Sequence, residues 1–75
     1  ARWTARVNFR EGRYVFGVEA DDGVRLWVDG DLLIDNWREG IRSLRAERYF
    51  GSRADREVRV EYFERWGNAR IRVWW

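Results

Sequence analysis

Two adjacent carboxylates, Asp21 and Asp22, stand before Gly23 and between two runs of alternating apolar residues. Calcium binds several oxygen ligands from carboxylates, amides, carbonyls and water, so this pair could supply two of them. Side chains of adjacent residues on an extended strand point in opposite directions, and these two converge on one ion only if the backbone between them is unusual. The spacing alone is more typical of an ordinary turn, with a metal site as the alternative.

Two tryptophans, Trp37 and Trp66, fall in segments rich in turn-forming residues. Sugar faces stack on exposed aromatic rings while acids and amides bond the hydroxyls, so both residues are candidates for ligand contact. The alternative is that each ring packs as a lid over one end of a barrel. Both interpretations stay open at this point.

Most common catalytic groups are missing from the chain. It contains no His and no Cys, which removes the usual general base, the thiol nucleophile and the soft metal ligands. Acids are plentiful enough for a two-carboxylate glycosidase, but no pair stands out, and so short a chain has little room for a deep cleft. We therefore expect a noncatalytic protein.

The charges are numerous and nearly balanced. Fifteen arginines and 13 acids give a net charge of +2, and the two signs are interleaved along the chain. Because no basic cluster is set apart from the acids, we expect no nucleic-acid partner. No apolar run is long enough to span a bilayer, so we expect no membrane insertion.

Alternating apolar and polar residues predict a series of short strands. Residues 41–50 fit a strand but also allow a helical turn, and we interpret them as a strand. The expected strands cover residues 3–9, 14–20, 24–28, 32–34, 41–50, 58–63 and 69–75. This pattern predicts one all-β domain over residues 1–75, a small antiparallel β-sandwich or barrel of about six or seven strands.

Three glycines punctuate this pattern. Asp22-Gly23 and Asp29-Gly30 each separate two alternating runs, and each is expected to form a hairpin turn. Gly17 lies on the outward face of its strand, where a missing side chain marks a bulge or a close approach by another group.

A core of 75 residues is only marginally stable without reinforcement. Without cysteine, the reinforcement must come from aromatic packing, a bound metal or association with other chains. Aromatic residues make up 17% of the chain, which favours the first. We expect Trp3 and Trp75 in the core, and Trp27 and Trp74 facing outward against a second apolar layer or a partner.

The stretch from Asp21 to Asp29-Gly30, with the following Leu32-Leu33-Ile34-Asp35-Asn36-Trp37, resembles the signature of the protective antigen fourteen-kilodalton domain family. These β-barrel modules occur in anthrax-type toxins, yeast flocculins and adhesins, and bacterial glycosidases. Gly12-Arg13-Tyr14-Val15-Phe16 resembles the family's Gly-x-Tyr-x-Phe strand, and residues 58–64 and 69–74 resemble its final hairpin.

The resemblance implies a specific site. In the family's sugar-binding members, two consecutive Asp residues joined by a cis peptide bind calcium, which also contacts sugar hydroxyls. Asp21 and Asp22 match that pair, and Asn68 is the nearest equivalent of the Asn ligand on a second loop. The implied cofactor is calcium, the implied partner is a glycan or cell-surface polysaccharide, and the implied location is extracellular or at the cell surface.

Family domains are usually longer, and the resemblance implies a shortened member that lacks N-terminal strands. Without them, one sheet has an open edge that can pair with a strand of another chain or of a second copy. Two functions are therefore expected. The first is a noncatalytic carbohydrate-binding or adhesion module, and the alternative is a structural domain that assembles through open edges and exposed Trp residues.

Overall fold

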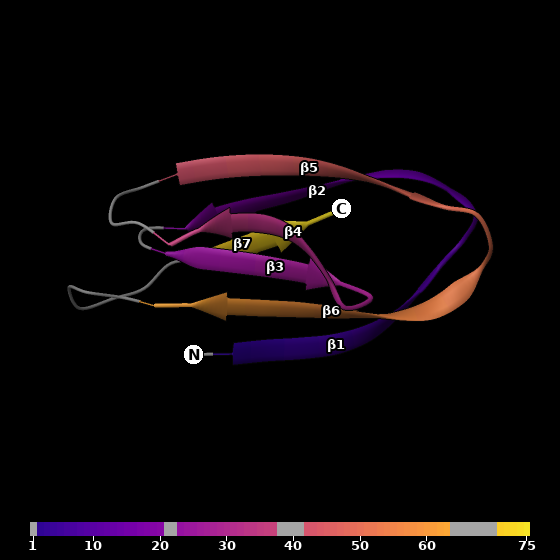
Figure 1. Cartoon of the computed structure of the whole chain (residues 1–75), viewed down its shortest axis with the longest axis horizontal. Helices are drawn as coiled ribbons and strands as arrows, with labels where there is room; N and C mark the ends of the chain where they lie inside the picture. Colours follow the sequence, from indigo (N-terminus) through magenta and orange to yellow (C-terminus); the bar gives the residue numbers. More distant parts are fainter. Residues whose placement is uncertain (1, 21–22, 38–41, 64–70) are drawn as a thin grey trace.

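The computed structural model describes residues 2–20, 23–37, 42–63 and 71–75, and it confirms an all-β sandwich (Figure 1). One antiparallel sheet has the strand order β1-β6-β3-β4, and the other has the order β5-β2-β7. The strands are β1 (Arg2–Phe9), β2 (Gly12–Ala20), β3 (Val24–Val28), β4 (Asp31–Asn36), β5 (Arg42–Phe50), β6 (Ala54–Tyr62) and β7 (Ile71–Trp74). Within these residues, no helix is long and apolar enough to cross a membrane.

The strand pairing is mostly between distant parts of the chain. β1 pairs with β6 in an unbroken register, and β2 pairs with β5 on one side and β7 on the other. Among the described strands, only β3 and β4 are both consecutive and paired. Strand β4 extends to Asn36, two residues beyond the strand expected over residues 32–34.

The core is the apolar face of each alternating strand. Because directly opposite residues of paired strands point to the same face, Val60 and Leu26 share one inner face, and Val18 lies on the facing sheet. Both inner faces bury their apolar side chains against each other. The buried residues are Phe9, Phe16, Val18, Ala20, Val24, Leu26, Val28, Ile34, Phe50, Val58 and Val60.

The two Asp-Gly dipeptides form different structures. Asp29 and Gly30 have φ angles of 54° and 83°, which suit a tight turn that follows the twist of the hairpin β3–β4. The hairpin expected at Asp22-Gly23 is wrong, because β2 and β3 belong to different sheets. Alternation does not distinguish a hairpin from a crossing between sheets, since both neighbouring strands bury an apolar face in either case.

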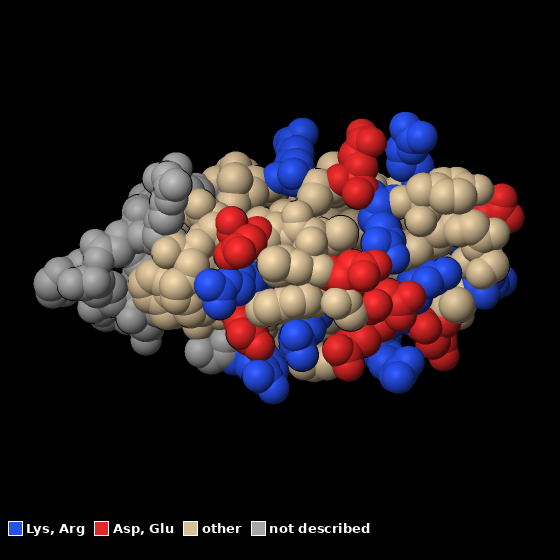
Figure 2. All heavy atoms as spheres, in the orientation of Figure 1, with Lys and Arg blue, Asp and Glu red and all other residues tan. Residues whose placement is uncertain are grey.

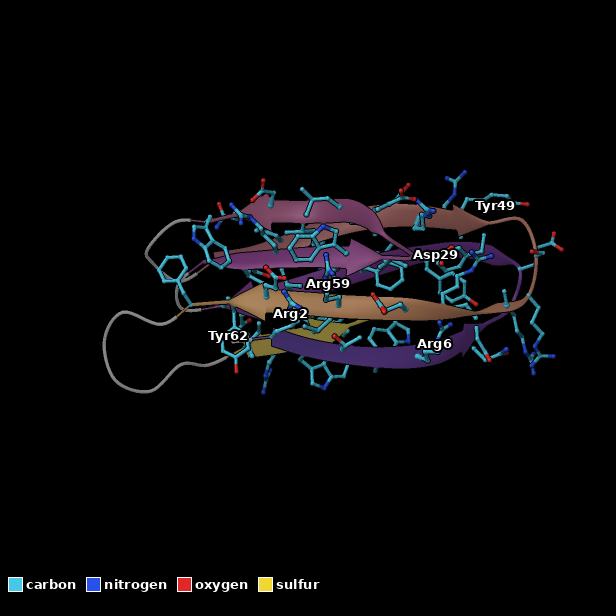
Figure 3. The ribbon with its side chains drawn as sticks, turned by 60° about the horizontal axis from the view of Figure 1, so that its bottom comes forward. Arg2, Arg6, Asp29, Tyr49, Arg59 and Tyr62 are labelled. Carbon is cyan, nitrogen blue, oxygen red and sulfur yellow. The ribbon has the colours of Figure 1, made fainter. Side chains whose placement is uncertain are left out.

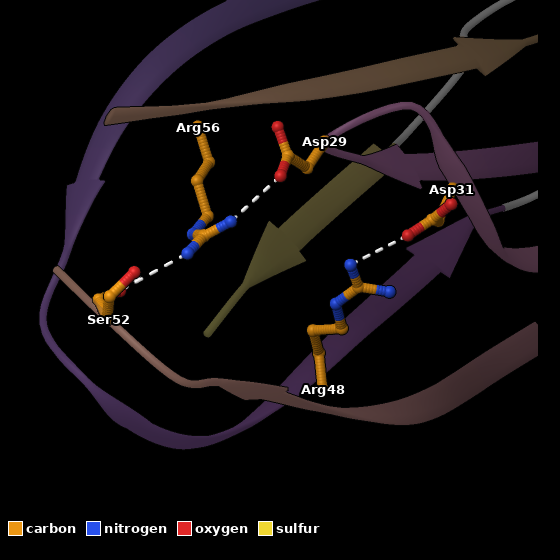
Figure 4. A network of polar contacts seen from close by, with 5 residues as sticks. All are labelled: Asp29, Asp31, Arg48, Ser52 and Arg56. Atoms are coloured by element: carbon orange, nitrogen blue, oxygen red, sulfur yellow. Dashed lines mark hydrogen bonds and ion pairs between the residues drawn. The ribbon is translucent and has the colours of Figure 1, made fainter. Parts of the chain in front are cut away.

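Two ion pairs fix the β3–β4 turn to the rest of the sandwich (Figure 4). Arg56 on β6 donates to Asp29 Oδ2 at 2.8 Å and to the Ser52 carbonyl at 3.2 Å. Arg48 on β5 reaches Asp31 Oδ2 at 2.6 Å, which ties one sheet to the other. We call this end, with Asp29, Asp31, Arg48 and Arg56, the turn end.

The turn end also holds a cluster of aromatic rings. The ring centroid of Phe9 lies 5.1 Å from Tyr14, 5.1 Å from Phe50 and 5.7 Å from Phe16. Arg56 covers the cluster, with its guanidinium carbon 4.2 Å from the centroid of Phe50. Edge-to-face ring contacts add to the stabilisation that burial gives, so this cluster supports the expected aromatic reinforcement.

The outward tryptophans are placed as expected, but the expected core tryptophans are not. Arg59 covers Trp27 at 4.4 Å on the outer face of its sheet, and Trp74 lies directly on Gly17, where a Cβ would overlap its ring. The close approach expected at Gly17 is confirmed. Trp3 and Trp75 are 46% and 45% exposed, so the prediction that they belong to the core is wrong. Both line an open groove, although the Trp75 ring centroid lies 5.8 Å from that of Phe9 and 6.1 Å from that of Phe16.

Candidate ligand-binding site at the loop end

The end opposite to the turn end is where β2, β4 and β6 end and where β3, β5 and β7 begin (Figure 1). We call it the loop end. Residues 21–22, 38–41 and 64–70 connect these strands and lie outside the described residues. The predicted site residues Asp21, Asp22, Trp66 and Asn68 are therefore not described, and their roles stay predictions, as does the cis peptide between the two aspartates.

The residues that flank these segments are held together at two points. Ala20, which precedes Asp21, pairs with Ile71, which follows segment 64–70. Gly23 follows Asp22, and its carbonyl accepts a hydrogen bond of 3.1 Å from the Phe63 amide, just before segment 64–70. The residues on both sides of segment 21–22 are therefore joined to the residues on both sides of segment 64–70.

Gly23 is required here by packing. A Cβ at this position would overlap the ring of Phe63, so only glycine allows the strand to pass beneath that ring. The sequence pattern assigned Gly23 to a turn and gave no sign of this contact. The missing side chain lets the backbone at Gly23 approach Phe63 closely.

Trp37 is the one predicted ligand-binding residue that the structure describes. Its ring centroid lies 4.8 Å from that of Phe63, with the planes inclined at 59°. The guanidinium carbon of Arg25 lies 4.4 Å from the Trp37 ring, and 41% of the residue remains exposed. The ring therefore covers Phe63 as a lid would, and it still presents surface to solvent as a ligand-binding ring would.

An open hollow of about 540 Å³ adjoins Trp37. Trp37 and Phe63 contribute aromatic surface, whereas Arg2 and Glu61 form an ion pair of 3.2 Å at the side. Tyr62 completes the lining, and it lies with Arg2 toward the same end of the molecule (Figure 3). A planar apolar surface beside fixed hydrogen-bonding groups is an arrangement that suits a sugar ring.

A row of alternating charges crosses the outer face beside this hollow. The register places Arg2 opposite Glu61, Glu61 opposite Arg25, and Arg25 opposite Asp35. The Arg25 Nε to Asp35 Oδ1 distance is 2.9 Å. This row offers donors and acceptors in alternation, and sequence reasoning missed it because only the register brings the residues of four strands into line. Figure 2 likewise shows acidic and basic side chains intermixed over the face it displays.

The described residues do not form a metal site by themselves. Within 2–20, 23–37, 42–63 and 71–75, no three acidic side chains come together as metal ligands would. A calcium ion at the loop end would therefore depend on Asp21, Asp22 and Asn68. Their carboxylate and amide oxygens are the hard ligands that this cation prefers.

Comparison with known proteins shows which family the chain belongs to. The family model of the PA14 domain matches residues 1–75. The chain belongs to the PA14 domain family. The match confirms the resemblance at the level of the family and does not single out its toxin or flocculin members.

One relative of this PA14 domain lies within a longer protein. The anti-sigma-I factor RsgI3 of Acetivibrio thermocellus is 37% identical over 76 residues, which cover 99% of this chain and 12% of the factor. The chain thus spans about an eighth of the relative that it matches. No solved structure matches the chain. PA14 domains are generally noncatalytic binding modules, and carbohydrate binding or adhesion is common among them.

Proposed function

We propose that this PA14 domain is a noncatalytic carbohydrate-binding module that works outside the cell or at its surface, with calcium at the loop end. Asp21, Asp22 and Asn68 hold the ion in this proposal, and Trp37 and Trp66 flank the sugar. The ligand is a glycan or a cell-surface polysaccharide.

The observation that carries the proposal is the double tie between the two site-bearing segments. Ala20 pairs with Ile71, and the Phe63 amide bonds the Gly23 carbonyl. Two loops that share their anchor points can direct ligands from both toward one ion. This supports a joint contribution from the aspartates of one segment and Asn68 of the other.

In this proposal, described side chains near the ion also contact the sugar. Trp37 offers an exposed ring beside the Arg2–Glu61 ion pair, so a sugar could stack on the ring and bond its hydroxyls to the charged pair. Binding of this kind serves an adhesin and a regulatory protein equally well. The similarity to an anti-sigma factor supports the regulatory setting.

The test of the ion is thermal unfolding in excess calcium and in chelator. An ion that binds only the folded state stabilises it by about 2.7 kcal/mol at 100 times its Kd. We expect this rise for the unchanged chain and its loss in Asp21→Asn/Asp22→Asn. Glu11→Gln/Glu47→Gln is the matched control, because it removes two charges from exposed residues far from the loop end. A calcium response that survives in the aspartate variant would contradict the proposal.

The test of the sugar is calorimetric titration with oligosaccharides in calcium buffer. Trp37→Ala should weaken binding about tenfold or more while the calcium response stays unchanged, because the ring contacts the sugar and does not ligate the ion. Trp27→Ala is the control, since Trp27 is an outward ring away from the loop end. Equal loss in both variants would contradict a role for Trp37 in sugar binding.

A further inference from the structure

Arginine side chains cover two of the partly exposed tryptophans and leave a third uncovered. The guanidinium carbon of Arg59 lies 4.4 Å from the ring of Trp27, and that of Arg25 lies 4.4 Å from the ring of Trp37. In the described part of the chain, no guanidinium and no second aromatic ring packs on Trp74, which is 37% exposed. Among these three tryptophans, Trp74 alone offers an uncovered ring to a ligand.

Trp74 lies flat on the outer face of the sheet β5-β2-β7. A Cβ at Gly17 would be nearest to Cε2 of Trp74 and next nearest to Cζ2 and Nε1, which flank Cε2 on the rim of the indole. Because these two atoms shield Cε2 at the rim, an atom that is nearest to Cε2 lies over the face of the ring. Gly17 is on the central strand, and it is buried although it faces outward. One face of the indole therefore rests on the glycine, and the other is turned to solvent.

Trp74 belongs to a diagonal row of exposed side chains on this face. Trp74 pairs with Gly17 and Tyr49 pairs with Arg13, so Val15 is the diagonal neighbour of both. Such neighbours are about 7–8 Å apart, which places the two aromatic residues about 15 Å apart. All three side chains are exposed, and Figure 3 shows Tyr49 at the turn end of β5. We call Tyr49, Val15 and Trp74 the apolar stripe.

Charged side chains of both signs border the apolar stripe on the same face. Arg45 lies opposite Gly17, and Glu19 lies opposite Arg72. Within the described ranges, none of these three charged residues forms an ion pair or a side-chain hydrogen bond. Their donors and acceptors are therefore free to bond a ligand. The charged residues of this face are Arg13, Glu19, Arg45, Glu47 and Arg72.

This mixture of uncovered rings and free charges suits a glycan better than a protein. The core of a protein interface is depleted in charged residues, whereas charged residues border the apolar stripe on both sides. A pyranose ring has an apolar face that stacks on an aromatic ring, and its hydroxyls both donate to carboxylates and accept from guanidinium groups. Chains with β-1,4 linkages are extended and ribbon-like, so they can lie on a flat face that has no walls.

We infer that the outer face of the sheet β5-β2-β7 binds a linear β-1,4-linked polysaccharide along the apolar stripe. One sugar ring stacks on Trp74, and a later ring of the same chain stacks on Tyr49. This surface shares no residue with the loop end, so the inference does not rest on the function proposed there. Its contacts are ring stacking and hydrogen bonds, so binding needs no calcium. A disaccharide is too short to contact both rings, whereas a hexasaccharide reaches both.

Calorimetric titration of the 75-residue chain with cellohexaose and xylohexaose in chelator tests the inference. At least one hexasaccharide should bind, about tenfold or more tightly than its disaccharide, because only the longer chain engages both rings. Binding of neither hexasaccharide in chelator would overturn the inference in favour of a protein contact. Asp21→Asn/Asp22→Asn should leave this binding unchanged, so a failure of the calcium proposal is seen separately. Loss of the calcium-independent binding in that variant would also overturn the inference.

Substitutions at the two rings test the position of the glycan. Trp74→Ala and Tyr49→Ala should each weaken hexasaccharide binding in chelator about tenfold or more. Trp27→Ala is the matched control, because its ring lies on the other sheet beneath Arg59 and should not contact the glycan. An equal loss in Trp27→Ala would overturn the inference.

The exposed ring of Tyr49 keeps the inference testable if Trp74→Ala fails to fold. Tyr49 is 60% exposed, so its removal should leave the fold intact. Tyr49→Phe keeps the ring and should retain most of the affinity that Tyr49→Ala loses. Equal affinity of Tyr49→Ala and the unchanged chain would overturn the placement of the glycan along the apolar stripe.

Discussion

The two ends of the sandwich carry the same Asp-Gly dipeptide and use it in different ways. At the turn end, Asp29-Gly30 joins two strands of one sheet, and positive φ angles explain the choice of residues. At the loop end, Gly23 immediately precedes β3 of that same sheet, and the absence of a side chain explains the choice, because Phe63 occupies that space. Glycine is therefore needed for its backbone conformation at the turn end and for its lack of a side chain at the loop end.

The described contacts near each dipeptide also differ. Asp29 and Asp31 are engaged in ion pairs with Arg56 and Arg48, which makes them part of the scaffold. At the loop end, the described contacts are rings, a hydrogen bond between backbone groups and ion pairs on the outer face such as Arg2–Glu61. The turn end is therefore expected to carry stability, and the loop end is expected to carry binding.

The largest difference in stability between the two ends is expected when one aromatic ring is removed from each. Phe9→Ala takes a buried ring out of the aromatic cluster and should lower the free energy of unfolding by about 3–5 kcal/mol. Trp37→Ala removes a ring that is 41% exposed and should lower it by about 1 kcal/mol. Denaturant unfolding of both variants measures the difference. Similar losses would mean that the loop end contributes to stability as much as the turn end does.

A second comparison uses the two glycines. Gly23→Ala should destabilise the chain by about 1–3 kcal/mol through overlap with Phe63, and Gly30→Ala by about 1 kcal/mol through backbone strain in open space. A double-mutant cycle separates the overlap from the backbone strain. In a Phe63→Ala background, Gly23→Ala should cost less stability, whereas the cost of Gly30→Ala should stay unchanged. Gly30→Asn should recover part of the loss, since Asn tolerates positive φ. Additivity of Gly23→Ala with Phe63→Ala would argue against the packing explanation.

The smallest expected effect concerns the acids. Asp29→Asn should lower the free energy of unfolding by about 1 kcal/mol, because the Arg56 side chain is only 14% exposed and loses its charged partner. Asp35→Asn should change it by less than about 0.5 kcal/mol, because both partners in the Arg25–Asp35 pair are well exposed. Urea unfolding at low and high salt compares the two pairs, and salt should screen the Asp35 pair more strongly. A larger loss for Asp35→Asn than for Asp29→Asn would contradict the expectation that the Arg56–Asp29 pair contributes more to stability.

The strands could be predicted from the sequence because alternation is a local property. Residues 42–50 of the ambiguous stretch form β5, as the strand interpretation expected, and Ala46 pairs with Phe16 on the inner face. Alternation also placed Trp27 and Trp74 outward correctly. It failed for Trp3 and Trp75, because the period assigns a residue to a face and does not say whether another sheet covers that face at that point.

The candidate site was less predictable for the same reason. Trp37 was identified from its place in a turn-rich segment, which is local information. Phe63, Arg25 and Arg2 come to Trp37 only through the pairing of β1, β6, β3 and β4, and no pattern in the sequence specifies that order. The roles of Asp21, Asp22, Asn68 and Trp66 stay predictions that the calcium and sugar experiments test.

The pairing of distant strands has a consequence for how the chain is made. During synthesis, the β3–β4 hairpin can form as soon as both strands leave the ribosome, whereas β1 must wait for residues 54–61 and β2 for residues 42–50. Pairings between distant residues close large loops and form slowly. The apolar faces of the first two strands therefore emerge long before their partners. Most of the sandwich can therefore assemble only after β5 and β6 have been synthesised, and until then the nascent chain exposes apolar side chains.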